Sequence, residues 1–305
     1  MQPKEEKGLR EPKYLKVYQF IRPNAPTRST TCTLDIPEDV IRRRLGNIPL
    51  EVAQQTLNNT TQLASRSAEM PLHRRYKTHF EQLRYRRLKT TIYSDTFTSS
   101  VKSTRGNTKT QGFVNGDSYF IYQYPMSCES QAAQGFGIPA HVHTDNAKVE
   151  TLSEWKKTVQ HHQIKQTVTE PYSPWQNKAE HEFGKICTAT HLLMDINHVP
   201  ARLWDYAQAH AVEVSNHTAR KALDWKTPLE RETGDTPDCS HLLHFDFYQL
   251  VWYWDPSETK FPIAKRKLGC WLGVAPNVGQ ALCYYILTIC GNTIARSTVK
   301  GMECH

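Results

Sequence analysis

The stretch that decides the fold is HTDNAKVE, residues 143–150, together with PYSPWQNKAEHEFGKI, residues 171–186. The first stretch places Asp145 at the end of a short apolar run. The second places Glu180 at the start of a predicted helix, behind a Pro-Tyr-Ser-Pro turn. A third acid, Asp95, lies near the end of a β-rich run upstream. Each acid therefore falls at the end of a predicted element, where functional side chains are often found.

Around these acids, the order of predicted elements indicates an α/β fold. Runs rich in β-branched and aromatic residues predict five strands. These strands span 90–97, 108–114, 118–126, 138–144 and 164–168. Asn115-Gly116 predicts a hairpin between the second and the third. Amphipathic or uninterrupted patterns predict helices over 152–162, 176–197 and 201–223. Three antiparallel strands followed by parallel ones predict a mixed five-stranded sheet with flanking helices, with the three acids converging on one edge.

The flanking sequences predict smaller units. Residues 1–35 carry few periodic signals, whereas 37–62 predict two short helices, with Pro37 and Pro49 in their first turns and Gly46 between them. After residue 240, short aromatic runs separated by turns predict a small all-β, SH3-like barrel region. The predicted divisions are an N-terminal tail with helices (1–62), a basic linker (63–90), a core (91–223) and a post-core segment with the β region (224–305).

Composition excludes several classes of protein. The chain has 305 residues, of which 38% are hydrophobic, and no apolar run approaches the roughly 18 residues of a membrane span. The N-terminus lacks the apolar stretch of a signal peptide, so we expect an intracellular protein without a membrane partner. The eight cysteines include no CxxC pair, which argues against a zinc ribbon and for reduced thiols.

Positive charge is concentrated in one window. The net charge is +8, and residues 71–90 alone hold seven basic residues against one acid. The basic residues are Arg74, Arg75, Lys77, Arg84, Arg86, Arg87 and Lys89. A solvated linker is the simpler interpretation. Tyr76, Phe80 and Tyr85 are interleaved with the charges, which favours an arm that contacts a nucleic-acid backbone.

The three acids suit the chemistry of phosphodiester bonds. Two magnesium or manganese ions about 4 Å apart activate the attacking oxygen and neutralise the leaving one. Carboxylate oxygens are the ligands that such ions prefer. We expect Asp95 to bridge the two ions, with Asp145 on one and Glu180 on the other. Spacing alone is weak evidence, because an aspartate at a strand end is more often a cap or a turn residue.

The motif HTDNA followed by PYSPWQNKAE resembles the integrase core of retroelements, whose three acids follow the D,D-35-E pattern on a ribonuclease H-like fold. The resemblance covers most of residues 40–300. Residues 227–245 and 265–287 resemble the post-core segment and the barrel-like stretch of Ty1/copia-type polyproteins. EVAQQTLNNTTQLA, residues 51–64, is similar to their pre-integrase region.

The resemblance implies an enzyme that trims the ends of element DNA and joins them to double-stranded target DNA in the nucleus, working as a homo-oligomer. Asp95, Asp145 and Glu180 match the catalytic, metal-binding acids, with Glu182 as a rival for the glutamate. The residues that match the DNA-contacting loop before the glutamate helix are Tyr172, Ser173, Pro174, Gln176 and Asn177, with Trp175 among them. Lys178 and Lys185 flank the glutamate as candidate phosphate contacts. Trp204, Trp225, Trp252, Trp254 and Trp271 are expected in the core.

The chain departs from the family between the third and fourth predicted strands. Residues 127–134 make barely two helical turns, about 12 Å, where related cores carry a longer helix. A shortened core motivates an alternative, a catalytically inactive DNA-binding remnant of a retrotransposon polyprotein. A third possibility, a nuclease that cuts RNA–DNA hybrids, fits the same fold but is disfavoured by the copia-like 227–245 segment.

Overall fold

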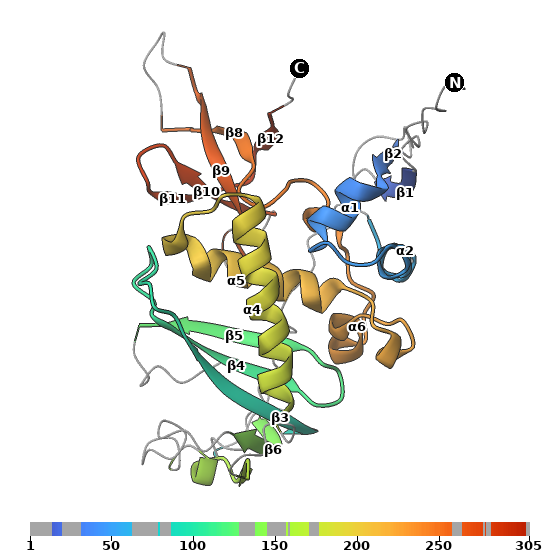
Figure 1. Ribbon diagram of the computed structural model, residues 1–305, viewed down its shortest axis with the longest axis vertical. Helices are drawn as coiled ribbons and strands as arrows, with labels where there is room; N and C mark the ends of the chain where they lie inside the picture. The colour runs from blue at the N-terminus through green and yellow to red at the C-terminus, as the bar shows by residue number, and fades with distance from the viewer. Residues whose placement is uncertain are drawn as a thin grey trace, which may run out of the picture.

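The computed structural model of the protein describes residues 14–19, 32–62, 79, 87–127, 138–144, 157, 159–170, 177–257, 264–276, 278 and 282–302 (Figure 1). Two five-stranded sheets and a layer of helices make up most of the described chain. None of the described helices combines the length and the hydrophobicity of a membrane-spanning segment.

The larger sheet has the strand order β5-β4-β3-β6-β7. Its strands are β3 (Arg87–Thr98), β4 (Lys109–Asn115), β5 (Ile121–Met126), β6 (Ile138–Thr144) and β7 (Lys165–Val168). The β3–β4 and β4–β5 pairs are antiparallel, and β3–β6 and β6–β7 are parallel. The prediction of a mixed, ribonuclease H-like sheet is therefore confirmed. The Asn115-Gly116 signal marks the turn of the β4–β5 hairpin.

Two long helices cover one face of this sheet. In Figure 1, α4 (Lys178–Ile196) crosses the sheet and α5 (Trp204–His217) lies beside it. The buried side chains between the helices and the sheet include Val114, Ile121 and Phe183. Gly112 makes this close approach possible, because a Cβ there would lie 1.6 Å from the Phe183 ring. The predicted end of the second helix at residue 223 is wrong, since α5 ends at His217 and Thr218 is extended.

The N-terminal part contains the two predicted helices, α1 (Glu38–Arg44) and α2 (Leu50–Asn59). Pro37 and Pro49 stand one residue earlier than predicted, at the N-caps, and Gly46 adopts a positive φ of 77° in the connection. An antiparallel pair that the sequence did not predict, β1 (Tyr14–Gln19) and β2 (Cys32–Pro37), precedes α1.

The C-terminal part is a five-stranded antiparallel sheet in the order β11-β10-β9-β8-β12, which confirms the predicted all-β region. Its strands are β8 (Leu250–Trp254), β9 (Arg266–Val274), β10 (Tyr284–Thr288), β11 (Thr293–Arg296) and β12 (Val299–Gly301). Fully buried Trp271 and Ile286 pack in one cluster with Leu203 and Tyr206, so this sheet rests on the start of α5.

The segment between α5 and β8 is fixed to the larger sheet by a carboxylate. Glu232, in the short helix α6 (Pro228–Thr233), accepts hydrogen bonds from Asn115, Ser118 and Tyr122 at 2.8, 2.6 and 2.9 Å. All three donors belong to the β4–β5 hairpin. The post-core segment therefore holds the hairpin that is paired, through β4, with the strand carrying Asp95.

Candidate active site

The first candidate acid, Asp95, lies on β3 where the parallel ladder with β6 ends. Ser94 pairs with Thr144, the last residue of β6. In the sequence, Asp95 directly follows Ser94 and Asp145 directly follows Thr144. Asp145 itself lies outside the described residues. The Asp95 side chain is half-buried, and its Oδ1 accepts a hydrogen bond from the Thr96 amide at 2.7 Å.

The second candidate acid, Glu180, lies in the first turn of α4, exposed to solvent. Asn177 caps this turn and is only 2% exposed. Its Oδ1 accepts from the Ala179 amide at 3.0 Å, while its Nδ2 donates to the Ser94 carbonyl at 3.2 Å. The turn that carries Glu180 is therefore bonded directly to the residue before Asp95.

The Asp95 carboxylate also influences the pKa of Cys187, in the middle of α4. Burial raises the pKa of the Cys187 thiol, and the negative charge of Asp95 raises it further. Cys187 lies seven residues after Glu180, which places both residues on the same face of the helix. Asp95 and Glu180 thus belong to the same side of the sheet, next to the same helix face.

Glu182, the rival for the glutamate, has a structural role. It is 3% exposed and forms ion pairs with Arg220 at 2.7 Å and Lys185 at 2.8 Å. Burial alone would raise its pKa, but these two cations hold the pKa below its ordinary value. With both oxygens engaged inside the protein, Glu182 is poorly placed to hold a metal ion, whereas Glu180 is exposed.

The two candidate lysines have protein partners. The Lys178 ammonium donates to the Gly116 carbonyl at 3.1 Å and lies 5.7 Å from the centre of the Tyr93 ring. Lys185 is engaged by Glu182. Both lysines are exposed, and each ammonium group has three donors. Each lysine therefore keeps donors for a phosphate.

Most of the other candidate DNA contacts lie outside the described residues. These are Tyr172, Ser173, Pro174, Trp175 and Gln176 of the loop, and Arg74, Arg75, Lys77, Arg84 and Arg86 of the basic window. Of the shortened segment at 127–134, only Ser127 is described. β3 begins at Arg87, whose side chain lies outside the description, and Lys89 is exposed. The helix predicted over 152–162 is described at 157 and 159–162; it is helical at 157 and 159–161, with Val159 buried, and residue 162 is in a turn.

A chain of polar side chains that was not predicted from the sequence supports the end of β6. It crosses β3, β6 and β7 with successive contacts of 3.0, 2.7, 2.8 and 3.2 Å between Thr91, His141, Thr167, His143 and Thr169. Thr169 also donates to the Thr144 carbonyl at 3.2 Å. Burial lowers the pKa of both histidines, which favours neutral rings. Each neutral ring then donates through one nitrogen and accepts through the other. The alternation His141, His143, Asp145 was the available signal, because residues two apart on a strand share a face.

The donor chemistry of the site fits a hard cation. Asp95 and Glu180 supply the carboxylate oxygens that magnesium prefers. Within the described ranges, no three acidic, histidine or cysteine side chains gather closely enough to hold a metal ion. The third expected ligand, Asp145, lies beyond those ranges, directly after Thr144.

A second surface gathers aromatic and basic side chains on the C-terminal sheet. Trp252 and Trp254 on β8 are 38% and 42% exposed, so the expectation that they are core residues is wrong. Lys300 pairs with Trp252, and Arg266 pairs with Trp254. Of the other tryptophans expected in the core, Trp204 and Trp271 are buried, whereas Trp225 is partly exposed. Exposed aromatic rings beside cations are typical of surfaces on which nucleobases stack.

Comparisons with known proteins give weak likenesses. No protein-family model matches the chain, and no curated protein matches it. A chain of the simian T-cell lymphotropic virus intasome in complex with the PP2A regulatory subunit B56 gamma is 13% identical, with a TM-score of 0.38 over 71% of this chain and 83% of that one. The HTLV-2 integrase catalytic core domain in complex with magnesium is 19% identical, with a TM-score of 0.36 over 48% of this chain and 98% of that one. Scores this low do not bear on function.

Proposed function

We propose that this chain is an integrase-type polynucleotidyl transferase of a Ty1/copia-type retroelement. It would trim the 3′ ends of element DNA and join them to double-stranded target DNA in the nucleus. The sequence motifs around Asp145 and Glu180 support the reaction class, and the copia-like segments support the element type.

The observation that carries the proposal is the bond from Asn177 to the Ser94 carbonyl. It fixes the first turn of the glutamate helix against the strand end that carries Asp95. Side chains that act on one phosphate must be held in a fixed mutual arrangement, and this bond couples the two elements that supply two of the three acids.

In the proposed reaction, the residues of the chain bind and orient. Asp95, Asp145 and Glu180 would hold two magnesium or manganese ions. When bound, such ions supply Lewis acidity to the attacking and leaving oxygens. Asn177 keeps the glutamate turn in place, and the polar chain ending at Thr144 holds the end of the strand that precedes Asp145.

DNA would be bound by surfaces on either side of the acids. Lys178 lies at the start of α4, the basic window precedes β3, and Trp252 and Trp254 lie on the C-terminal sheet. Contacts of this kind go mainly to phosphates and base faces, so binding is expected to depend on salt rather than on sequence.

A strand-transfer assay tests the proposal. Purified protein would be mixed with a short duplex from the element terminus and a supercoiled plasmid, in magnesium or manganese. We expect joined product from the wild type and none from Asp95→Asn, Asp145→Asn or Glu180→Gln. Asp195→Asn, which neutralises an exposed carboxylate near the other end of α4, is the matched control and should join normally.

Two outcomes would count against a joining enzyme. Undiminished joining by the Glu180→Gln protein would remove Glu180 from the reaction. Salt-dependent DNA binding by the wild type without any joined product would instead favour the inactive remnant.

A further inference from the structure

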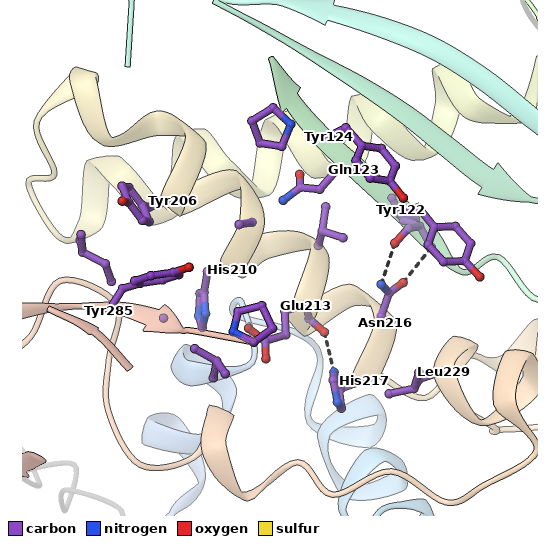
Figure 2. Close-up of a pocket in the computed structure, with 18 of the residues that line it drawn as sticks. Tyr122, Gln123, Tyr124, Tyr206, His210, Glu213, Asn216, His217, Leu229 and Tyr285 are labelled. Atoms are coloured by element: carbon purple, nitrogen blue, oxygen red, sulfur yellow. Dashed lines mark hydrogen bonds between the residues drawn. The ribbon is translucent and has the colours of Figure 1, made fainter. Parts of the chain in front are cut away.

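A cavity of about 360 Å³ lies between β5, α5 and the C-terminal sheet. Figure 2 shows Tyr206 and Tyr285 on one side of it and Tyr122 and Tyr124 on the other, with His210 and Glu213 between them. This volume is within the range of small-ligand pockets. None of its residues belongs to the site around Asp95 and Glu180.

The cavity has a carboxylate in its wall. Burial alone would raise the pKa of Glu213, but the adjacent His241 brings the pKa well below its ordinary value. His241 Nε2 contacts Glu213 Oε1 at 2.7 Å, and 14% of the Glu213 side chain stays exposed. A carboxylate has about four acceptor positions, so one such contact leaves others for a ligand.

The histidines nearest to Glu213 on α5 do not neutralise it. Burial lowers the pKa of His210 and of His217 to about 4, so both rings are uncharged at neutral pH. Two further polar atoms in the wall, Gln123 Oε1 and His210 Nδ1, are buried and have no hydrogen-bond partner among the described residues. His210 as a whole is only 4% exposed. Unpaired buried polar atoms are costly, and a ligand with N–H donors would relieve that cost.

The aromatic wall already holds a cation at its edge. The Arg105 guanidinium lies 4.1 Å from the centre of the Tyr206 ring, and its charge is balanced by Asp205 at 2.8 Å. Tyr285 packs edge-on against the same ring, with centroids 5.6 Å apart. Tyrosine faces attract cations most strongly in sites shielded from water. Arg105 thus adds no unbalanced positive charge to oppose a second cation.

We propose that this cavity binds a small organic cation with N–H donors, an alkylammonium or guanidinium group. Glu213 holds its charge, Tyr206 and Tyr285 contact its alkyl part, and Gln123 and His210 accept its hydrogen bonds. Such a group is carried by lysine or arginine side chains of a protein segment and by free polyamines. The proposal is independent of the DNA-joining function.

Calorimetric titration of the full chain with n-butylammonium chloride tests this, with 1-butanol as the uncharged analogue of the same size. We expect saturable binding of the ammonium, and binding of the alcohol at least about tenfold weaker. Glu213→Gln should weaken ammonium binding by at least about tenfold, because a buried charge loses its partner. Glu230→Gln is the matched control and should bind as the wild type does, since Glu230 pairs with exposed Lys226 away from the cavity.

A second variant keeps the test independent of folding in the first. Ala209 lines the cavity from α5, so Ala209→Phe fills it without removing a polar group and should abolish binding. Tighter binding of Nα-acetyl-lysine amide than of spermidine would identify a protein segment as the source of the cation, and the reverse order would identify a polyamine. Equal binding of butanol, undiminished binding by the folded Ala209→Phe protein, or no saturable binding of the ammonium would each overturn the proposal.

Discussion

Substituting Gly112 should separate the glutamate helix from the sheet. Gly112 pairs with Asp95 in the β3–β4 ladder, and a Cβ at this position would lie 1.6 Å from Phe183 Cζ and 2.2 Å from Cε2. Carbon atoms in contact are about 3.5–4 Å apart, so the ring must move by about 2 Å. Phe183 is 4% exposed and packed among buried neighbours, so it cannot simply swing into solvent.

The expected magnitude follows from the size of this overlap. Inserting a methyl group into a packed core typically costs about 1–3 kcal/mol. Because the obstacle is a buried aromatic ring rather than the end of a flexible chain, Gly112→Ala should lower the free energy of unfolding by about 3 kcal/mol. Urea denaturation followed by circular dichroism measures the change.

The same substitution elsewhere provides the control. Gly184 lies inside α4, and a Cβ there would meet no atom within 4 Å. Gly184→Ala should therefore stabilise the protein by up to about 1 kcal/mol, through helix propensity alone. Two Gly→Ala changes are thus expected to have opposite signs.

A double substitution tests whether Phe183 is the cause. Adding Phe183→Leu to Gly112→Ala should recover part of the loss, with a coupling energy of about 1–3 kcal/mol, because the two positions are in contact. Manganese affinity of Gly112→Ala should also fall, since a displaced α4 moves Glu180 relative to Asp95. A loss below about 0.5 kcal/mol in the single variant, or strict additivity in the double one, would refute the close approach of α4 and β4.

Three further outcomes are expected. Burial lowers the pKa of His210 and His217 from 6.5 to about 4, so the unfolded chain takes up protons first. The free energy of unfolding from urea titrations should then fall between pH 7.5 and 5 by about 2 kcal/mol per histidine, and His210→Phe should lose correspondingly less. Asn177→Asp keeps the helix cap but places an acceptor oxygen against the β3 carbonyl, so it should weaken manganese binding in calorimetry and lower the free energy of unfolding by about 1–3 kcal/mol. Single-stranded DNA should quench the fluorescence of exposed Trp252 and Trp254, and Trp252→Ala with Trp254→Ala should weaken binding by about 1–3 kcal/mol per base stacked.

The larger sheet could be predicted because its strands are short, separated by clear turn signals and arranged in an order that few topologies satisfy. The Asn115-Gly116 turn predicted the antiparallel hairpin, and the apolar run ending at Thr144 predicted a strand, in which Ile138, Val142 and Thr144 are buried. The ends of helices and strands were harder to predict from the sequence. The pattern after His217 stays compatible with a helix, and only the tertiary packing decides that Thr218 turns away. The sequences of β1 and β2 have no strong periodicity, so the pairing of these two strands could not be predicted.

The candidate site, too, was predictable only in part. Motif and spacing selected Asp95, Asp145 and Glu180, but the bond that joins two of their elements runs from Asn177 to a backbone carbonyl, and a carbonyl has no sequence signature. The QNKAE motif already favoured Glu180 over Glu182, and the structure adds that Arg220, 38 positions from Glu182, engages only Glu182.

Surface and interior were hardest to separate where every residue is apolar. LVWYW on β8 alternates between buried and exposed positions, yet its composition is uniform, so nothing in it says that Trp252 and Trp254 face outward. Conversely, Glu213 is a polar residue in a helix, which predicts an exposed side chain. It becomes part of a cavity wall because β9 and β10 fold back over α5. In both cases, whether the side chain is buried depends on which face a neighbouring element covers. That arrangement arises only when segments far apart in sequence pack together.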